Sequence, residues 1–247
     1  MLDQDTLGKL RAMRLSAMAT AIEDQRTNTT FASLSFEERL GMIVDAEWLY
    51  RQNCSLRARL GKAKLKIGAA SLEDLDLSPK RNLDGALIRQ LKTGKWVENR
   101  HNVIITGKTG SGKTFLACAL AQQACRLGFK ALYRRAPRLA HELAIARADG
   151  SLAKVLATLE RTHVLVIDDW GLAPLKDQER RDLLEVFEDR YDATSTIITS
   201  QLPVETWHDT IGDPTIADAI CDRLVHNAFK VALNADESKR KEAAAKK

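Results

Sequence analysis

The sequence predicts an α/β protein, in which helices flank a mostly parallel sheet of five strands and an all-helical region precedes it. Two observations lead to this prediction. From residue 102 onward, short apolar segments typical of buried strands alternate with longer segments of helical spacing. Residues 1–65 contain no strand signal, and their apolar residues recur at helical spacing. Strands that alternate with helices form crossover connections, so helices are expected on both faces of the sheet.

The predicted elements of the α/β region follow one another closely. The five strands are expected at 102–106, 130–135, 163–169, 195–201 and 229–233. Pro137 suits the first turn of one helix, and residues 178–191 form another. Asp213 and Pro214 are an N-cap followed by proline, which predicts a third helix. Ligands of such sheets bind at the carboxyl ends of the strands, so the site is expected there.

The region before the sheet is expected to fold separately. Ser35 and Glu38 have the spacing of a capping box, which predicts a helix after Ser35. The periodic pattern is lost from residue 71, which indicates a linker. The expected divisions are 1–66 for the helical domain, 67–98 for a linker with a short helix over 83–91, 99–235 for the α/β domain and 236–247 for a basic tail.

A glycine-rich motif lies between the first strand and the helix that follows it. Its residues, which fit G-x-x-x-x-G-K-[ST] at every fixed position, are Gly107, Lys108, Thr109, Gly110, Ser111, Gly112, Lys113 and Thr114. Such a loop turns backbone N–H groups toward a phosphate at a helix N-terminus. Lys113 would reach the β- and γ-phosphates, and Thr114 would bind Mg²⁺. A turn that merely needs glycine is the alternative, but the register of Lys113 and Thr114 favours nucleoside triphosphate binding.

Two acids end the third predicted strand. A carboxylate there can hold Mg²⁺ directly or through water, which is the role predicted for Asp168. Asp169 is then placed to orient or deprotonate the attacking water. The alternative is an acidic turn after a buried strand. Because aspartate is one methylene shorter than glutamate, we expect Asp169 to support slow hydrolysis.

Polar side chains also end the fourth predicted strand, at Thr199, Ser200 and Gln201. One of them could locate the attacking water or sense the γ-phosphate, while turn capping is the alternative. The choice among the three stays open at this point. Gln201 is favoured because its amide reaches farthest.

Arg223 lies at the end of the helix before the last strand. It could pair with Asp222 or with another local acid. It could instead serve as an arginine finger that stabilises charge on the γ-phosphate held by a neighbouring subunit. The second role requires an oligomer with the site at the subunit boundary.

Basic residues form two clusters without interspersed acids. The net charge of +5 and the isoelectric point near 9.0 also favour an anionic partner. Contact with nucleic-acid phosphates is predicted for the first cluster and is plausible for the second, with a solvated face or, for the first, a protein-docking face as the alternative. The first cluster contains Arg51, Arg57, Arg59, Lys62, Lys64 and Lys66, and the second Arg126, Lys130, Arg134, Arg135 and Arg138.

Other features of the sequence argue against several classes of protein. The four cysteines show no C-x-x-C spacing, which favours reduced thiols in a cytosolic protein over a disulfide framework or a metal site. No basic N-terminal region leads into an apolar segment, so no signal peptide is expected. No apolar run approaches membrane-spanning length, so no membrane association is expected.

Taken in order, these motifs resemble the AAA+ ATPases. The closer resemblance is to the IstB-type transposition helper ATPases, which are relatives of the DnaC-type helicase loaders. The stretches that carry it are the phosphate loop and residues 116–121, 167–171, 181–185, 199–205 and 222–227. They are more specific than the phosphate loop alone and extend over most of the chain.

The resemblance implies an ATP-dependent DNA-binding regulator of an insertion sequence. ATP would drive assembly of a homo-oligomer on double-stranded DNA, with ATP at the subunit interfaces, and the assembly would recruit and stimulate the transposase. By this resemblance Lys113 and Thr114 bind phosphates and metal, Asp168 the metal and Asp169 the water, and Arg223 is the finger in trans. Residues 1–66 would serve DNA binding or oligomerisation.

The sequence departs from the AAA+ pattern in two respects. Few residues follow residue 233, so the usual helical lid is not expected, and Asp169 stands where glutamate is common. The alternatives in function are a helicase loader, a metabolic kinase and a non-enzymatic ATP switch. A kinase would need an acceptor pocket and a mobile lid, and neither is visible in the sequence.

Overall fold

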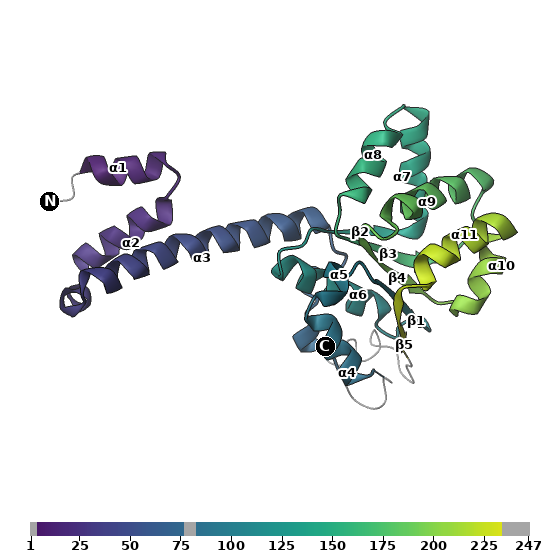
Figure 1. The fold of residues 1–247 in the computed structure, drawn as a ribbon, viewed down its shortest axis with the longest axis horizontal. Coiled ribbons are helices and arrows are strands. Elements are labelled where there is room, and N and C mark those ends of the chain that lie inside the picture. The colour runs from purple at the N-terminus through teal and green to yellow at the C-terminus, as the bar shows by residue number, and fades with distance from the viewer. Residues whose placement is uncertain (1–3, 77–82, 234–247) are drawn as a thin grey trace, which may run out of the picture. The chain divides into compact units, whose positions relative to one another are not determined.

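The computed structural model describes residues 4–76 and 83–233. The chain forms two compact units, Met1–Ala58 and Arg59–Lys247, which are called unit 1 and unit 2 (Figure 1). The division falls inside one long helix, a few residues before the predicted domain boundary. The predicted tail at 236–247 lies outside the described residues. Within the described ranges, no helix combines the length and apolarity that a membrane crossing requires.

Unit 1 is built from helices α1 (Gln4–Ala12), α2 (Ser16–Thr27) and η1 (Thr29–Ser33) and from the first part of α3 (Phe36–Ala63). The predicted capping box is confirmed, because the Glu38 N–H donates to Ser35 Oγ at 3.2 Å and the Ser35 N–H donates to the Glu38 carboxylate at 2.8 Å. Glu47 of α3 is buried and accepts the N–H groups of Ala17 and Met18. It thereby satisfies donors in the first turn of α2 and fixes α2 against α3.

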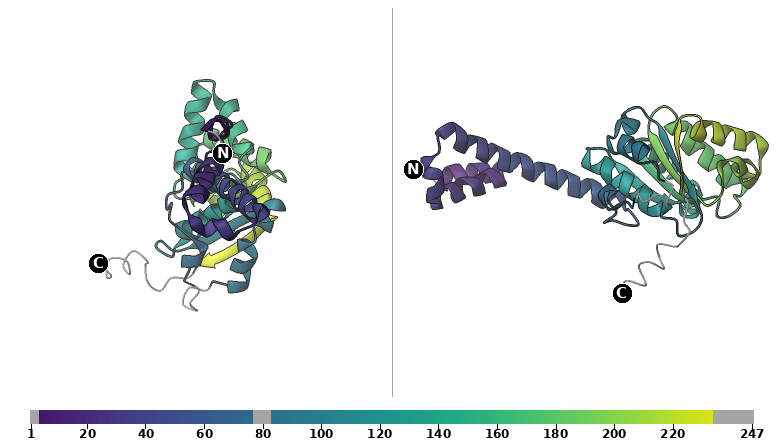
Figure 2. Two further views of the ribbon diagram at one scale, coloured as in Figure 1. Left: turned by 90° about the vertical axis from the view of Figure 1, so that its left-hand side faces the viewer. Right: turned by 90° about the horizontal axis from the view of Figure 1, so that it is seen from below.

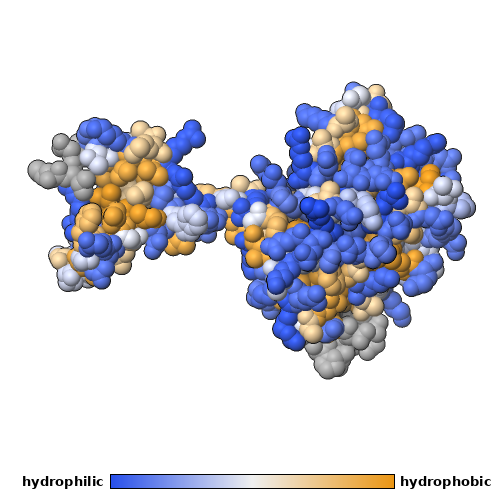
Figure 3. Space-filling model, viewed as in Figure 1, coloured by the Kyte–Doolittle hydropathy of each residue, from blue (hydrophilic) through white to orange (hydrophobic). Residues whose placement is uncertain are grey.

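A row of large apolar side chains on α3 is exposed to solvent. Phe36, Leu40, Val44 and Trp48 recur every four residues and are each more than two-fifths exposed. Residues at this spacing share one face of a helix. Figure 3 shows hydrophobic surface gathered on unit 1. An exposed apolar surface of this kind marks an interaction site.

Unit 2 contains the parallel sheet that the sequence predicts. Its strands are β1 (Asn102–Gly107), β2 (Ala131–Arg135), β3 (Val164–Trp170), β4 (Ser195–Ser200) and β5 (Ala228–Leu233). Their order is β2-β3-β4-β1-β5, and every neighbouring pair is parallel. Each strand lies within one or two residues of its predicted range, so the predicted fold class is confirmed.

Helices cover both faces of this sheet (Figures 1 and 2). On one face lies α6 (Lys113–Arg126), which packs on β2, β3 and β4. With it lie η2 (Leu72–Asp74), α4 (Gly85–Lys92) and α5 (Lys95–Glu98), formed by the segment predicted as a linker. On the other face lie α7 (Ala136–Ala148), α8 (Leu152–Glu160), α9 (Asp177–Arg190), η4 (Val204–Thr206), α10 (Trp207–Ile211) and α11 (Pro214–Val225).

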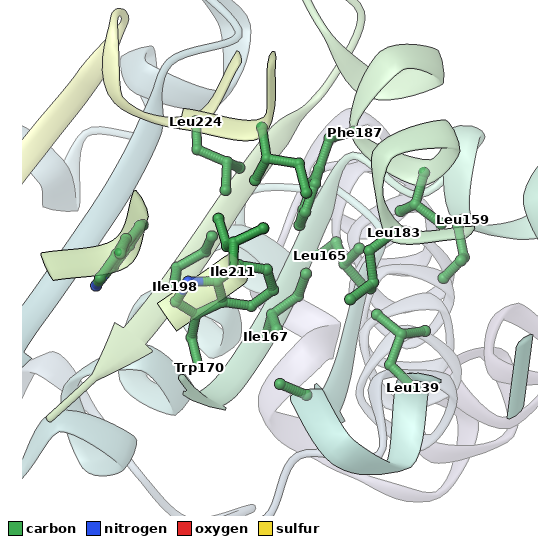
Figure 4. Close-up of a cluster of buried hydrophobic side chains, with 14 of the residues drawn as sticks. Leu139, Leu159, Leu165, Ile167, Trp170, Leu183, Phe187, Ile198, Ile211 and Leu224 are labelled. Carbon is green, nitrogen blue, oxygen red and sulfur yellow. The ribbon is translucent and has the colours of Figure 1, made fainter. Parts of the chain in front are cut away.

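The main hydrophobic core of unit 2 lies between the sheet and the second group of helices. Leu165 and Ile167 of β3 are fully buried in it, together with Phe187 of α9 (Figure 4). Trp170 packs edge-on against Phe187, with the ring centroids 5.7 Å apart. Successive side chains of a strand point to opposite faces, so the continuously apolar first part of β3, from Val164 to Ile167, supplies both layers. This packing fixes the strand ends from which the site is built.

Candidate nucleotide-binding site

A cavity of about 560 Å³ opens at the carboxyl edge of the sheet, within the size range of small-molecule sites. Its walls are formed by the phosphate loop and by side chains from four other segments. Those side chains belong to Lys66, Arg135, Asp169 and Gln201. The cavity thus lies where the fold class predicts ligand binding.

The phosphate loop has the backbone geometry of an anion cradle. Gly110 and Gly112 have φ values of 85° and 98°, which favour glycine, and α6 begins immediately afterwards at Lys113. A Cβ atom on Gly107 would lie 2.4 Å from the carbonyl oxygen of Leu233 on β5, so this position also requires glycine. The N-terminus of α6 therefore faces the cavity with its backbone N–H groups available to an anion.

Lys113 lies folded over this loop. Its ammonium group donates to the carbonyl oxygens of Gly107 at 2.7 Å and Lys108 at 2.9 Å. Burial lowers the pKa of Lys113, while the negative charges of Asp168 and Asp169 oppose that shift. The cation is thus held by neutral acceptors in a position next to the cradle, and an anionic ligand would bind it more strongly than these carbonyls do.

Asp168, at the end of β3, is fully buried and accepts several hydroxyl groups. Thr114 Oγ1 lies 3.0 Å and 3.1 Å from its two carboxylate oxygens, and the hydroxyls of Tyr133 and Thr199 each lie at 2.5 Å. Burial alone would raise the pKa of Asp168, but hydrogen bonds from Thr199, Tyr133 and Thr114 outweigh it and keep the pKa below its usual range. The carboxylate is therefore ionised.

An ionised carboxylate beside a threonine hydroxyl is a set of hard oxygen donors, which fits Mg²⁺. Thr114 and Asp168 were predicted for this role, and the structure brings them together at hydrogen-bond distance. Tyr133 was not identified from the sequence. Burial and the bond to Asp168 raise its pKa, so it stays a neutral donor to the carboxylate. The sequence feature that could have indicated this role is a tyrosine on β2, the strand that pairs with β3.

Asp169 lines the cavity in a strained conformation. Its φ of 62° is uncommon for a residue other than glycine, and its N–H donates to Thr199 Oγ1 at 3.2 Å. Its carboxylate forms an ion pair with the guanidinium group of Arg135, at 3.0 Å. The acid predicted to act on water is thus fixed by its backbone and paired with a cation.

The three polar residues at the end of β4 have different surroundings. Thr199 is buried against Asp168, and Ser200 donates to the carbonyl oxygen of Trp170. Gln201 lines the cavity, and its amide oxygen accepts the Thr109 hydroxyl of the phosphate loop at 2.7 Å. Of the three side chains, Gln201 is the one that faces the cavity.

Arg223 lies at the opposite edge of the sheet from the phosphate loop. Its carbonyl oxygen accepts the side-chain amide of Asn102, the first residue of β1, whereas the phosphate loop begins at the last residue of β1. Its guanidinium group pairs with Glu188 of α9 at 2.5 Å and donates to the Ala219 carbonyl. Arg223 therefore does not line the cavity of its own chain, and its local acid is Glu188.

Two residues of the predicted DNA-facing clusters lie in the cavity instead. Lys66 is 3.5 Å from Asp168, and Arg135 pairs with Asp169. This placement was not predicted, because a run of like charges does not reveal which distant acid each member meets.

Other members of the clusters have partners elsewhere. Arg51 pairs with Glu47 in unit 1. Arg59 donates to the carbonyl oxygen of Cys125 in unit 2. Arg134 and Arg138 both pair with Glu142. Arg57, Lys62 and Lys64 are exposed.

Comparison with solved structures shows the fold. The DnaC helicase loader aligns with a TM-score of 0.57 and 21% identity, over 67% of this chain and 97% of that chain. AMPPCP-bound DnaA from Aquifex aeolicus aligns with a TM-score of 0.56 and 19% identity, over 72% of this chain and 55% of that one. At these identities the likeness concerns the fold alone, which is the AAA+ fold.

Comparison of sequences identifies the family. The family of IstB-like ATP-binding proteins matches residues 8–246. A protein of Sinorhizobium fredii (strain NBRC 101917 / NGR234), named as an insertion sequence ATP-binding protein, is 48% identical over 97% of this chain and 98% of its own length. The ATP-binding protein of insertion sequence IS1162 from Pseudomonas fluorescens is 50% identical over 83% of this chain and 89% of its own. These matches confirm the resemblance read from the motifs, and the chain belongs to the family of IstB-like ATP-binding proteins.

Proposed function

We propose that this protein is an ATP-dependent DNA-binding regulator of transposition. It assembles as a homo-oligomer on double-stranded DNA with ATP at the subunit interfaces, hydrolyses ATP and recruits the transposase of its insertion sequence. The observation that carries the proposal is the convergence of Lys113, the Thr114–Asp168 pair and Asp169 on one cavity, in a chain whose relatives are named as insertion sequence ATP-binding proteins.

The phosphate loop and Lys113 would bind the triphosphate. The N–H groups at the start of α6 hold phosphate oxygens, and Lys113 exchanges its bonds to the Gly107 and Lys108 carbonyls for bonds to phosphate. Thr114 and Asp168 would hold Mg²⁺, which supplies positive charge to the phosphate oxygens when bound. Tyr133 and Thr199 keep the Asp168 carboxylate oriented.

Asp169 would orient the attacking water or accept its proton. In the structure, Arg135 holds that carboxylate, and the pair must open or shift before Asp169 can take the proton. Gln201, already bonded to the phosphate loop, is placed to position the water or to sense the γ-phosphate. The Arg135–Asp169 ion pair and the short aspartate side chain support slow turnover.

Assembly would complete the site. Arg223 lies at the sheet edge opposite its own cavity, so it could contact a nucleotide only in another subunit, where it would stabilise charge on the γ-phosphate. The exposed apolar row on α3, with Phe36 and Trp48, supports association with a partner. Contacts with DNA would come from exposed cations such as Arg57, Lys62 and Lys64 and would weaken steeply as salt is raised.

Binding to a labelled duplex, measured by fluorescence anisotropy, tests this proposal. We expect tight binding with ATP and Mg²⁺, and weak binding without ATP. Lys113→Ala should lose the ATP-dependent binding, whereas Asp169→Asn should retain it and lose hydrolysis. Duplex affinity that is independent of ATP in the wild-type protein would contradict the proposal.

The Arg135–Asp169 pair gives a separate prediction. Removing the guanidinium group in Arg135→Ala should free the Asp169 carboxylate and raise DNA-independent ATP turnover a few-fold. Phosphate release measured in steady state provides the readout. Arg138→Ala is the matched control, because Arg138 lies three residues away and pairs with Glu142 instead. Equal or lower turnover in Arg135→Ala would show that the pair does not restrain the acid.

A further inference from the structure

Lys66 enters the nucleotide cavity from outside the motifs that form it. It lies three residues after the end of α3, and its side chain lines the cavity together with the phosphate loop. Its ammonium nitrogen is 3.5 Å from the Asp168 carboxylate. Asp168 is fully buried, whereas the Lys66 side chain is 42% exposed. One end of this ion pair is therefore fixed and the other can move.

The backbone beside Lys66 is held in place. Arg59, seven residues earlier, donates to the carbonyl oxygen of Cys125 in α6. Burial raises the pKa of the Cys118 thiol of the same helix, and the backbone of Lys66 and Ile67 beside it opposes that shift. Ala63 and Ala70, on either side of this stretch, are fully buried. Because α6 also carries Lys113 and Thr114 at its start, Lys66 is anchored to the same helix that begins at the phosphate loop. Its presence in the cavity is thus a consequence of the packing of unit 2.

Lys66 and a divalent cation would compete for Asp168. Both are positive, and the carboxylate also accepts Thr114, Tyr133 and Thr199, which leaves little room for two cations on its open side. Like charges so close together repel each other strongly in a partly buried site. The four-carbon stem of lysine allows the ammonium group to move away while the backbone stays fixed. Asp169, the other acid of the cavity, is paired with Arg135, so the phosphates of a bound nucleotide would give the ammonium group its new anionic partner.

We propose that Lys66 is a second nucleotide-binding lysine, whose ammonium group pairs with Asp168 when no nucleotide is bound and with a phosphate oxygen when nucleotide and Mg²⁺ are bound. The proposal rests on the nucleotide binding proposed above. It assigns Lys66 to the ATP site, whereas its position in a basic run suggested a contact with DNA.

The test uses Lys66→Met in the full-length protein, which keeps most of the aliphatic stem and removes the charge. Equilibrium binding of a fluorescent ATP analogue is measured while Mg²⁺ is titrated. At saturating Mg²⁺, affinity for the analogue should fall roughly tenfold, because a charge-assisted contact to phosphate is lost. The Mg²⁺ concentration needed for half-maximal binding should fall, because the competing cation is gone. Lys66→Arg should retain most of the affinity, and Lys154→Ala, at an exposed position of α8, should behave as wild type.

A weaker affinity for the nucleotide together with a lower Mg²⁺ requirement distinguishes the loss of a phosphate contact from general damage to the site. General damage would weaken nucleotide binding and raise the Mg²⁺ requirement together, and that result would overturn the proposal. Unchanged nucleotide affinity in Lys66→Met, with loss of duplex binding, would also overturn it and return Lys66 to the DNA surface. If the wild-type protein failed to bind the analogue, the proposed function itself would fail. Thermal unfolding without nucleotide confirms that each variant is folded.

Discussion

Replacing Lys113 by alanine is expected to weaken ATP binding by about two orders of magnitude. A charge-assisted contact of this kind contributes about 1.5–3 kcal/mol, and Lys113 is placed to make more than one such contact. Its ammonium group lies directly over the phosphate loop, bonded to two carbonyl oxygens that a triphosphate would replace. Isothermal titration with ATP and Mg²⁺ measures the effect.

Lys108→Ala provides the matched control for this variant. Lys108 belongs to the same loop, but its side chain is exposed and only its backbone is predicted to contact phosphate. We therefore expect near wild-type affinity. If Lys113→Ala bound ATP as tightly as Lys108→Ala does, the phosphate loop would not be the binding site.

Replacing Arg190 by alanine is expected to have the largest effect on stability. Arg190 ends α9, is 2% exposed, and donates to the carbonyl oxygens of Leu159, Thr162 and Ser195 and to the hydroxyl of Thr196. These bonds tie α8, the turn before β3 and the start of β4 together. Removing the guanidinium group leaves buried acceptors without donors, which should cost about 3–5 kcal/mol.

Urea unfolding of the full-length protein, followed by circular dichroism, measures this loss. Arg181→Ala is the control on the same helix, because the Arg181 side chain is exposed, and its unfolding should change little. Lysine at position 190 should not restore stability, because a single ammonium group cannot match the guanidinium fork. An Arg190→Ala variant as stable as Arg181→Ala would show that the buried bonds contribute no net stability.

The strands and the phosphate loop could be predicted because their signals are local. The segment from Val164 to Ile167 is continuously apolar, as a strand buried on both faces requires, and the glycine positions of the loop follow from its backbone geometry. Likewise, the capping box at Ser35 needs only residues three apart. The conformation of each of these features is determined by a few neighbouring residues.

The contacts of these basic side chains could not be predicted, because their partners are distant in sequence. Lys66 meets Asp168 across 102 residues, and Arg135 meets Asp169 across 34. Their basic neighbours suggested contacts with DNA, yet the fold places these two side chains in the lining of the cavity. Arg190 was missed for the same reason, because a single arginine in an amphipathic helix gives no sign that it is buried among carbonyl groups.

We propose that each ATP site is completed by Arg223 of a neighbouring subunit on DNA. It is tested most directly by the ATP turnover of an equimolar mixture of Asp169→Asn and Arg223→Ala proteins with duplex DNA present. Each variant alone should be nearly inactive, whereas the mixture should regain part of the wild-type rate. In the mixture, the intact Asp169 of one subunit meets the intact Arg223 of the other. A mixture as inactive as either variant alone, with both variants folded, would contradict the account.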